Sequence, residues 1–344
     1  MELAPVPKTP APAPATPNTE SSLVPATSRL VRSLAVATLV ANIGIVVTGG
    51  AVRLTASGLG CPEWPLCTPD SLITTPEMGV HGIIEFGNRL LTFVLAAIAF
   101  AMVASVWKAR SARPDLFWLS VAALAGIPAQ AVIGGITVWT GLNPWVVGLH
   151  FIVSMAIIAV AVVLVNRAWL SRSRLDTAAA PLAGRTLRPV VWAIAVLSAI
   201  TVILGVIVTG SGPHAGDHGA ARNNLDSDLV TRLHVVPVYL LVFAVAVALY
   251  LVFRRGADRR LRLSLVIFAV VLLAQAVIGY TQHFLHLPIV LVALHMLGAS
   301  VMTAAAAHVV YTGLSRKVPG AVAGAAVSGG PVSGAEVSGA AARG

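Results

Sequence analysis

Eight long apolar runs are the feature that most limits what this chain can fold into. Each is long enough to cross a bilayer as a helix, which takes about 20 residues. The runs lie at 31–52, 80–107, 116–138, 146–166, 189–210, 229–253, 263–282 and 289–312. Only 10% of the residues are charged, against about a quarter in a soluble domain. The sequence therefore predicts an all-α integral membrane protein with eight transmembrane helices, and it excludes a water-soluble or a disordered chain.

The placement of the basic residues predicts how the chain lies in the membrane. Of the 23 basic residues, 19 lie on the two terminal segments and on the connections between spans 2 and 3, 4 and 5, and 6 and 7. By the positive-inside rule this side is cytoplasmic. We therefore expect a multi-pass protein of the cell membrane with both termini in the cytoplasm. The net charge of +10 is explained by these loops, so the lipid bilayer is an expected partner and nucleic acid is not.

An internal duplication divides the chain into two halves. The sequence AQAVIG occurs at 129–134 and again at 274–279, and His150 and His295 show the same offset of 145 residues. Because four spans separate the copies, both halves enter the membrane in the same direction. We expect two tandem, parallel-oriented four-helix bundles. The predicted organisation is a disordered Pro/Ala-rich tail, a first bundle with a long outer loop, a linker, a second bundle and a low-complexity tail, at 1–28, 29–168 (loop 53–79), 169–188, 189–314 and 315–344.

Ionisable residues within the spans mark the candidate site, because such groups are costly in lipid and usually functional. Three are histidines near the outer ends of their spans: His150, His234 and His295. One histidine alone is often a packing residue, but three at matching depth favour a metal or a heme. Zinc needs three or four ligands close together, whereas heme is held by axial histidines from facing helices. His234 and His295 therefore form a candidate bis-histidine pair in the second half.

The second span carries the remaining polar group. Glu85 and Arg89 are either an i, i+4 salt bridge that neutralises two buried charges, or a carboxylate near a reacting group with an arginine that pairs a substrate carboxylate. The repeat counterpart of His234 falls on Asn88, which shares a helix face with His81 and Glu85.

The most distinctive segment is the outer loop that contains both cysteines of the chain, Cys61 and Cys67. The loop faces the oxidising side of the membrane, where a disulfide can persist. The residues alone leave two roles open for these cysteines: a disulfide that only stabilises the loop, and a redox function. The other outer histidines, His214, His218, His283 and His286, are expected to be solvated, with a weak metal site as the less favoured alternative.

Three groups of residues resemble the heme A synthase family, eight-span membrane proteins that convert heme O to heme A for cytochrome oxidase. They are the segment from Thr48 to Cys67 (TGGAVRLTASGLGCPEWPLC), the sequence EFGNR from Glu85 to Arg89, and the histidines on spans 4, 6 and 8. The resemblance covers about 31–312. It implies oxidation of the heme O methyl group to the formyl group of heme A, with heme b as a permanent cofactor.

The resemblance also implies roles for individual residues. The axial ligands of heme b would be His234 and His295, and the substrate heme would bind His150. Glu85 would be the catalytic residue beside the methyl group, and Cys61 and Cys67 would form a disulfide. One departure is Asn88, which stands where many members have a second histidine for the substrate heme. Asn88 and Arg89 are therefore placed in the substrate site, with the number of histidine ligands in doubt and His81 as a distant substitute.

Further expectations concern partners and alternatives. Arg53, Arg89 and Arg232 lie near the outer surface and are candidate partners for heme propionates, which arginine suits well. A heme O synthase is the expected donor of the substrate, cytochrome oxidase assembly is the expected destination of the product, and a homo-oligomer is left open. The main alternative is a b-type cytochrome that transfers electrons, which would give Glu85 and the cysteines no task. A transporter is a third alternative, but it would need polar residues at the membrane midplane.

Overall fold

The structure is a computed structural model that describes residues 27–169 and 184–314. Within these residues it contains eight long helices and one short 3₁₀ helix, η1, at Pro76–Met78. The helices are α1 Arg29–Leu54, α2 Gly79–Trp107, α3 Pro114–Trp139, α4 Pro144–Ala168, α5 Gly184–Ser211, α6 Ser227–Arg254, α7 Arg259–Phe284 and α8 Ile289–Leu314. All eight are long and apolar enough to cross a membrane. The predicted class, an all-α multi-pass membrane protein, is confirmed.

The helix boundaries follow from local signals in the sequence. The side chains of Ser28, Asn143, Asp226 and Asp258 each accept a backbone hydrogen bond at the first turn of α1, α4, α6 and α7, as N-cap residues do. Helix α5 begins at Gly184, five residues before the predicted start at 189. Leu187 in this added turn is only 4% exposed and packs in the apolar core of the second half, so burial extends the helix. The predicted tails and most of the predicted linker lie outside the described residues.

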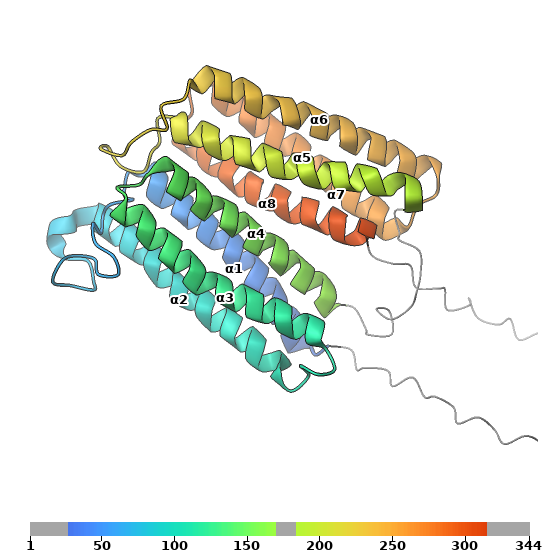
Figure 1. Ribbon diagram of the computed structural model, residues 1–344, viewed down its shortest axis with the longest axis horizontal. Coiled ribbons are helices and arrows are strands. Elements are labelled where there is room, and N and C mark those ends of the chain that lie inside the picture. Colours follow the sequence, from blue (N-terminus) through green and yellow to red (C-terminus); the bar gives the residue numbers. More distant parts are fainter. Residues whose placement is uncertain (1–26, 170–183, 315–344) are drawn as a thin grey trace, which may run out of the picture.

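The helices form two rings of four. Around the first ring α1 contacts α2, α2 contacts α3, α3 contacts α4, and α4 contacts α1. The second ring repeats this order with α5, α6, α7 and α8, and Figure 1 shows the two groups lying side by side. Helices α4 and α1 contact α8, and α4 contacts α5, which joins the rings. This arrangement agrees with two tandem four-helix bundles, and it places α2 opposite α4 and α6 opposite α8.

The two ends of the rings differ. One end, which we name the cysteine-loop end, carries the cysteine loop (residues 55–78) and the α3–α4, α5–α6 and α7–α8 connections (Figure 1). The opposite end, which we name the basic end, is where α1 begins and α8 finishes. Large buried apolar side chains such as Leu116, Leu164 and Phe268 pack in the half of each ring toward the basic end. The histidines lie in the other half.

Candidate functional site

Three histidines lie at the same depth in three helices. His150, His234 and His295 stand six or seven residues after the first residue of α4, α6 and α8, about 10 Å from the cysteine-loop end at 1.5 Å per residue. The Nδ1 atom of each imidazole is buried. Those of His150 and His295 have no hydrogen-bond partner, and the carbonyl of Thr201 lies near the imidazole of His234. Buried polar atoms are rarely left without a partner. These three imidazoles are therefore free to bind a ligand.

In the second ring two of these histidines come from opposite helices. His234 on α6 and His295 on α8 are close enough to interact electrostatically. Each imidazole rests on a glycine of a helix between them, because a Cβ at Gly205 or Gly279 would lie 3.1 Å from the Cε1 atom of His234 or His295. Two imidazoles from facing helices of a bundle are the donor set that heme iron takes as axial ligands. The residues present fit a bis-histidine heme.

The first ring repeats only half of this arrangement. His150 on α4 rests on Gly134 of α3, where a Cβ would lie 3.4 Å from its Cε1 atom. On the opposite helix α2 the corresponding position is Asn88, whose Oδ1 atom accepts a hydrogen bond from the Thr48 hydroxyl at 2.7 Å. The segments 44–49 (GIVVTG) in α1 and 205–210 (GVIVTG) in α5 are similar, which makes Gly44 the counterpart of Gly205. Gly44 has nothing within 4 Å of its Cβ position. The first ring thus offers one imidazole and open space where the second ring has another.

The rest of the described chain contains no denser set of ligands. Among residues 27–169 and 184–314 no group of three or more His, Cys, Asp or Glu side chains is placed to hold a metal ion. A structural zinc site needs such a group. The outer histidines in this part of the chain therefore belong to no such group. His214 is not simply solvated, since its ring Nε2 lies 3.1 Å from the carbonyl oxygen of Leu287.

Glu85 and Arg89 hold the cysteine loop onto α2. Glu85 is only 6% exposed; its Oε2 atom accepts from the backbone N–H of Cys61 at 2.7 Å, and its Oε1 atom accepts from Arg89 Nη2 at 2.7 Å. Arg89 also donates to the carbonyls of Cys61, Glu63 and Leu66. Together with the bond from Arg89 Nε to Glu85 Oε1 at 3.2 Å, these bonds use all five N–H groups of the guanidinium. A propionate at Arg89 would have to displace one of them, so its assignment to the substrate stays a prediction.

The cysteine loop closes over the end of the first ring. A disulfide joins Cys61 to Cys67, and both residues are fully buried. Trp64 packs on Gly135 of α3 and edge-on against Trp139, with ring centroids 5.2 Å apart. The loop is therefore fixed to α2 through Glu85 and Arg89, and to α3 through Trp64.

The other candidate residues lie nearer the surface. His81 is in the first turn of α2, exposed, with its Nδ1 atom 2.9 Å from Ser57 Oγ, about 10 Å along the helix from Asn88. It does not share the depth of the other histidines. Arg53 donates from Nε to the carbonyl of His214 at 2.6 Å and from Nη2 to that of Thr209 at 3.0 Å, so it ties the two rings together. Arg232 is exposed on α6.

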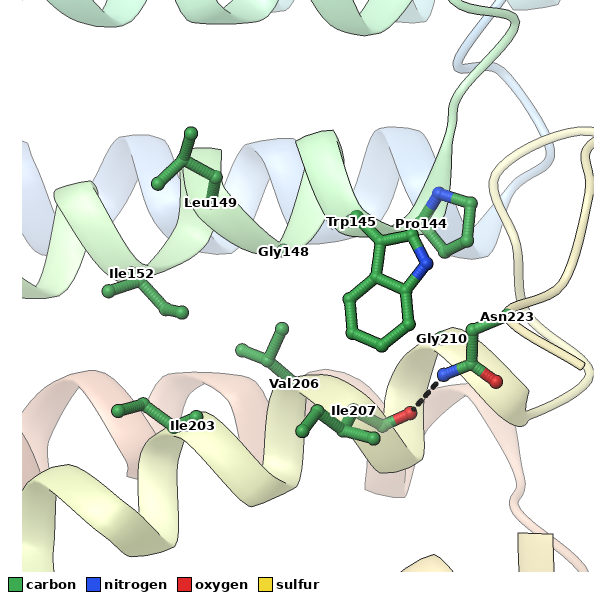
Figure 2. Close-up of a pocket in the computed structure, with 10 residues that line it drawn as sticks. All are labelled: Pro144, Trp145, Gly148, Leu149, Ile152, Ile203, Val206, Ile207, Gly210 and Asn223. Atoms are coloured by element: carbon green, nitrogen blue, oxygen red, sulfur yellow. Dashed lines mark hydrogen bonds between the residues drawn. The ribbon is translucent and has the colours of Figure 1, made fainter. Parts of the chain in front are cut away.

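A shallow apolar cavity of about 170 Å³ lies outside both rings, between α4 and α5. Figure 2 shows Ile152 of α4 facing Ile203 and Val206 of α5 across it. Its polar side chain, Asn223, donates to the carbonyl of Ile207 and accepts from the N–H of Leu225. Both ends of this amide are therefore already bonded.

Comparison with known proteins places the chain in a family. The model of the COX15-CtaA family, described as cytochrome oxidase assembly protein, matches residues 32–307. This chain belongs to that family. It is similar to the heme A synthase of Listeria monocytogenes, with 27% identity over 246 residues that make up 68% of this chain and 80% of the relative. It is 31% identical to the heme A synthase of Lysinibacillus sphaericus over 185 residues, which are 53% of this chain and 58% of the relative.

The family match spans nearly all of the eight helices and includes every candidate residue named above. The structure adds residues that sequence reasoning missed: Gly134, Gly205 and Gly279, which contact the histidines, and Trp64, which fixes the cysteine loop to α3. The repeated AQAVIG sequence was the available signal for two of these glycines, since each copy ends on one.

The disulfide between Cys61 and Cys67 predicts how the protein reacts with thiol-alkylating reagents. In protein purified without reductant, Cys61 and Cys67 should resist alkylation. After reduction, alkylation should add two alkyl groups per chain as measured by intact mass, since the chain has no other cysteine. Intact cells should be treated with the alkylating reagent before lysis, as a control for oxidation of the thiols during purification. Two alkyl groups in the unreduced sample would show free thiols and favour a transient redox role.

Proposed function

We propose that this protein is a heme A synthase, which oxidises the methyl group of heme O to the formyl group of heme A for the assembly of cytochrome oxidase. The observation that carries the proposal is the unequal pair of sites: two facing imidazoles in the second ring, and one imidazole opposite Asn88 in the first. Two imidazole ligands hold a permanent heme more firmly than one, whereas a substrate must enter and leave. The relatives that bear the name heme A synthase support this assignment.

The two rings would have different tasks. His234 and His295 would hold heme b, which supplies one-electron redox chemistry that side chains lack. His150 would hold the substrate heme O. With water as the formal oxygen source, the conversion of R–CH₃ and H₂O to R–CHO releases four protons and four electrons, and an electron acceptor outside this chain has to take up the electrons. Both sites lie near the cysteine-loop end, so propionates would reach the surface, where Arg53 and the exposed Arg232 are candidate partners.

The setting follows from the same proposal. The basic end would face the cytoplasm by the positive-inside rule, which puts the disulfide on the oxidising side of the plasma membrane. A heme O synthase in the same membrane would supply the substrate.

The proposal is tested by co-expressing the protein with a source of heme O and separating the extracted hemes by chromatography. Heme B together with heme A is the expected result. Heme B alone would favour a b-type cytochrome, and the absence of any heme would favour a transporter.

Glu85 is the proposed catalytic residue, and a conservative substitution tests it. Glu85→Gln keeps an oxygen that can accept from Cys61 N–H or Arg89, but it removes the negative charge and the proton-binding site. We expect the protein to fold and load heme while heme A formation falls by about 100-fold or more, as for loss of a general acid or base. Chromatography of extracted hemes measures the product, and the heme b absorption spectrum measures folding.

The matched control for this variant is Asp115→Asn. Asp115 pairs with Arg113 at the basic end, with Nε and Oδ1 3.0 Å apart, so it is an ion pair in a membrane helix far from the site. Its loss should leave heme A output unchanged. Normal output from Glu85→Gln would show that Glu85 serves only to hold the cysteine loop.

A further inference from the structure

The repeated sequence AQAVIG has a glutamine at the same position in each half, Gln130 on α3 and Gln275 on α7. A glutamine within an apolar transmembrane helix is costly unless its amide is hydrogen-bonded. Gln275 is only 8% exposed. The proposed heme sites do not by themselves explain why both copies keep this side chain.

Each glutamine bonds to the backbone of one histidine. The Nε2 atom of Gln275 donates to the carbonyl of His295 at 2.8 Å, and the Nε2 atom of Gln130 donates to the carbonyl of His150 at 3.0 Å. The Oε1 atoms of both amides are buried without a partner. In the second half the bond to the histidine carbonyl is therefore what fixes the glutamine, and in the first half Ser154 on the same helix as His150 also contacts the amide.

The glycine that ends each copy contacts the same histidine. Gly279 and Gly134 lie four residues, or one helical turn, after Gln275 and Gln130. A Cβ at Gly279 would lie 3.1 Å from Cε1 of His295, and one at Gly134 would lie 3.4 Å from Cε1 of His150. The two ends of the repeated motif thus contact one residue, the glutamine at its backbone and the glycine at its ring.

We propose that the motif Gln-Ala-Val-Ile-Gly is a clamp that orients a heme-binding histidine, with Gln275 the positioning residue for His295 and Gln130 the positioning residue for His150. The inference rests on the proposed function, because it assumes that these histidines bind heme. The bond to the carbonyl fixes the rotation of α8 or α4 at the histidine. The glycine lets the Cε1 edge of the imidazole come close to the neighbouring helix.

His234 provides an internal comparison. It rests on Gly205 of α5, but the residue one turn before this glycine is Thr201 rather than glutamine. The clamp therefore acts on only one of the two proposed axial ligands of heme b. Removing it should turn one imidazole plane relative to the other, rather than abolish both iron–nitrogen bonds.

The test uses Gln275→Met in the full-length protein loaded with heme b, because methionine nearly keeps the length of glutamine and lacks the donor. The measurements are the largest g value of the ferric low-spin heme by electron paramagnetic resonance, which reports the angle between the imidazole planes, and the rate of heme transfer to apomyoglobin. We expect a shifted g value and about 10-fold faster heme loss, as for other residues that support a metal ligand. Ser264→Ala, on α7 but toward the basic end, should match the wild type in both measurements.

A second variant keeps the test decisive if Gln275→Met does not fold. Gly279→Ala retains the glutamine bond but places a Cβ against the ring of His295, so it should also shift the g value. A wild-type g value in whichever of the two variants folds would overturn the clamp and leave the proposed function standing. Wild-type protein that holds no heme b would overturn both.

Discussion

His295→Ala is expected to empty the heme b site of the second ring. His234 and His295 are the two imidazoles that the opposite helices α6 and α8 bring together, and loss of one leaves the iron with a single ligand in a space shaped for two. The low-spin heme b spectrum of the purified protein should disappear almost completely. His234→Ala should have the same effect, because the pair binds as a unit.

The control for this prediction lies on the same helix. His308 is 13 residues after His295 on α8, about 20 Å further toward the basic end, and it is also partly buried. His308→Ala removes the same side chain from the same helix but should leave the heme b spectrum as in the wild type. An unchanged low-spin spectrum in His295→Ala would contradict the ligand assignment.

The sequence predicted the helices well because their causes are local. Hydrophobic length and N-cap residues such as Ser28 and Asp226 act within one or two turns, so most predicted boundaries lie within a few residues of the observed ones. The internal repeat predicted two four-helix bundles, and the contacts between the helices agree with this prediction. The start of α5 was missed because the burial of Leu187 depends on helices α6 and α7, which lie far along the chain.

The partners of Glu85 and Arg89 were beyond a sequence prediction for a similar reason. Their spacing indicated a salt bridge, and the structure contains it. It did not indicate that the pair also holds the backbone of Cys61 and Glu63, because those bonds depend on how the irregular part of the cysteine loop turns back over α2. The role of the glycines that contact the histidines could not be predicted for another reason. A glycine has no side chain, so its role can be recognised only when the position of the neighbouring imidazole is known.

Asn88→His is expected to change the spin state of the substrate heme. In the unmutated protein we predict one axial histidine for heme O, His150, because an amide is a poor ligand for heme iron beside an imidazole. Protein loaded with both hemes should therefore show high-spin and low-spin components in comparable amounts. Asn88→His should convert the high-spin component to low-spin, and His150→Ala should abolish binding of the substrate heme, both measured by absorption and electron paramagnetic resonance.

The first ring has room for the new imidazole, which makes this conversion a strict test. Gly44 occupies the place that Gly205 has under His234, and nothing lies within 4 Å of its Cβ position. A histidine at position 88 can therefore rest on Gly44 as His234 rests on Gly205, once the bond between Asn88 and Thr48 is lost. Asn88→Leu, which removes the same bond without adding a ligand, should stay high-spin. Two low-spin hemes in the unmutated protein would show that another residue already fills this position, and the difference between the two rings would then not separate a substrate site from a cofactor site.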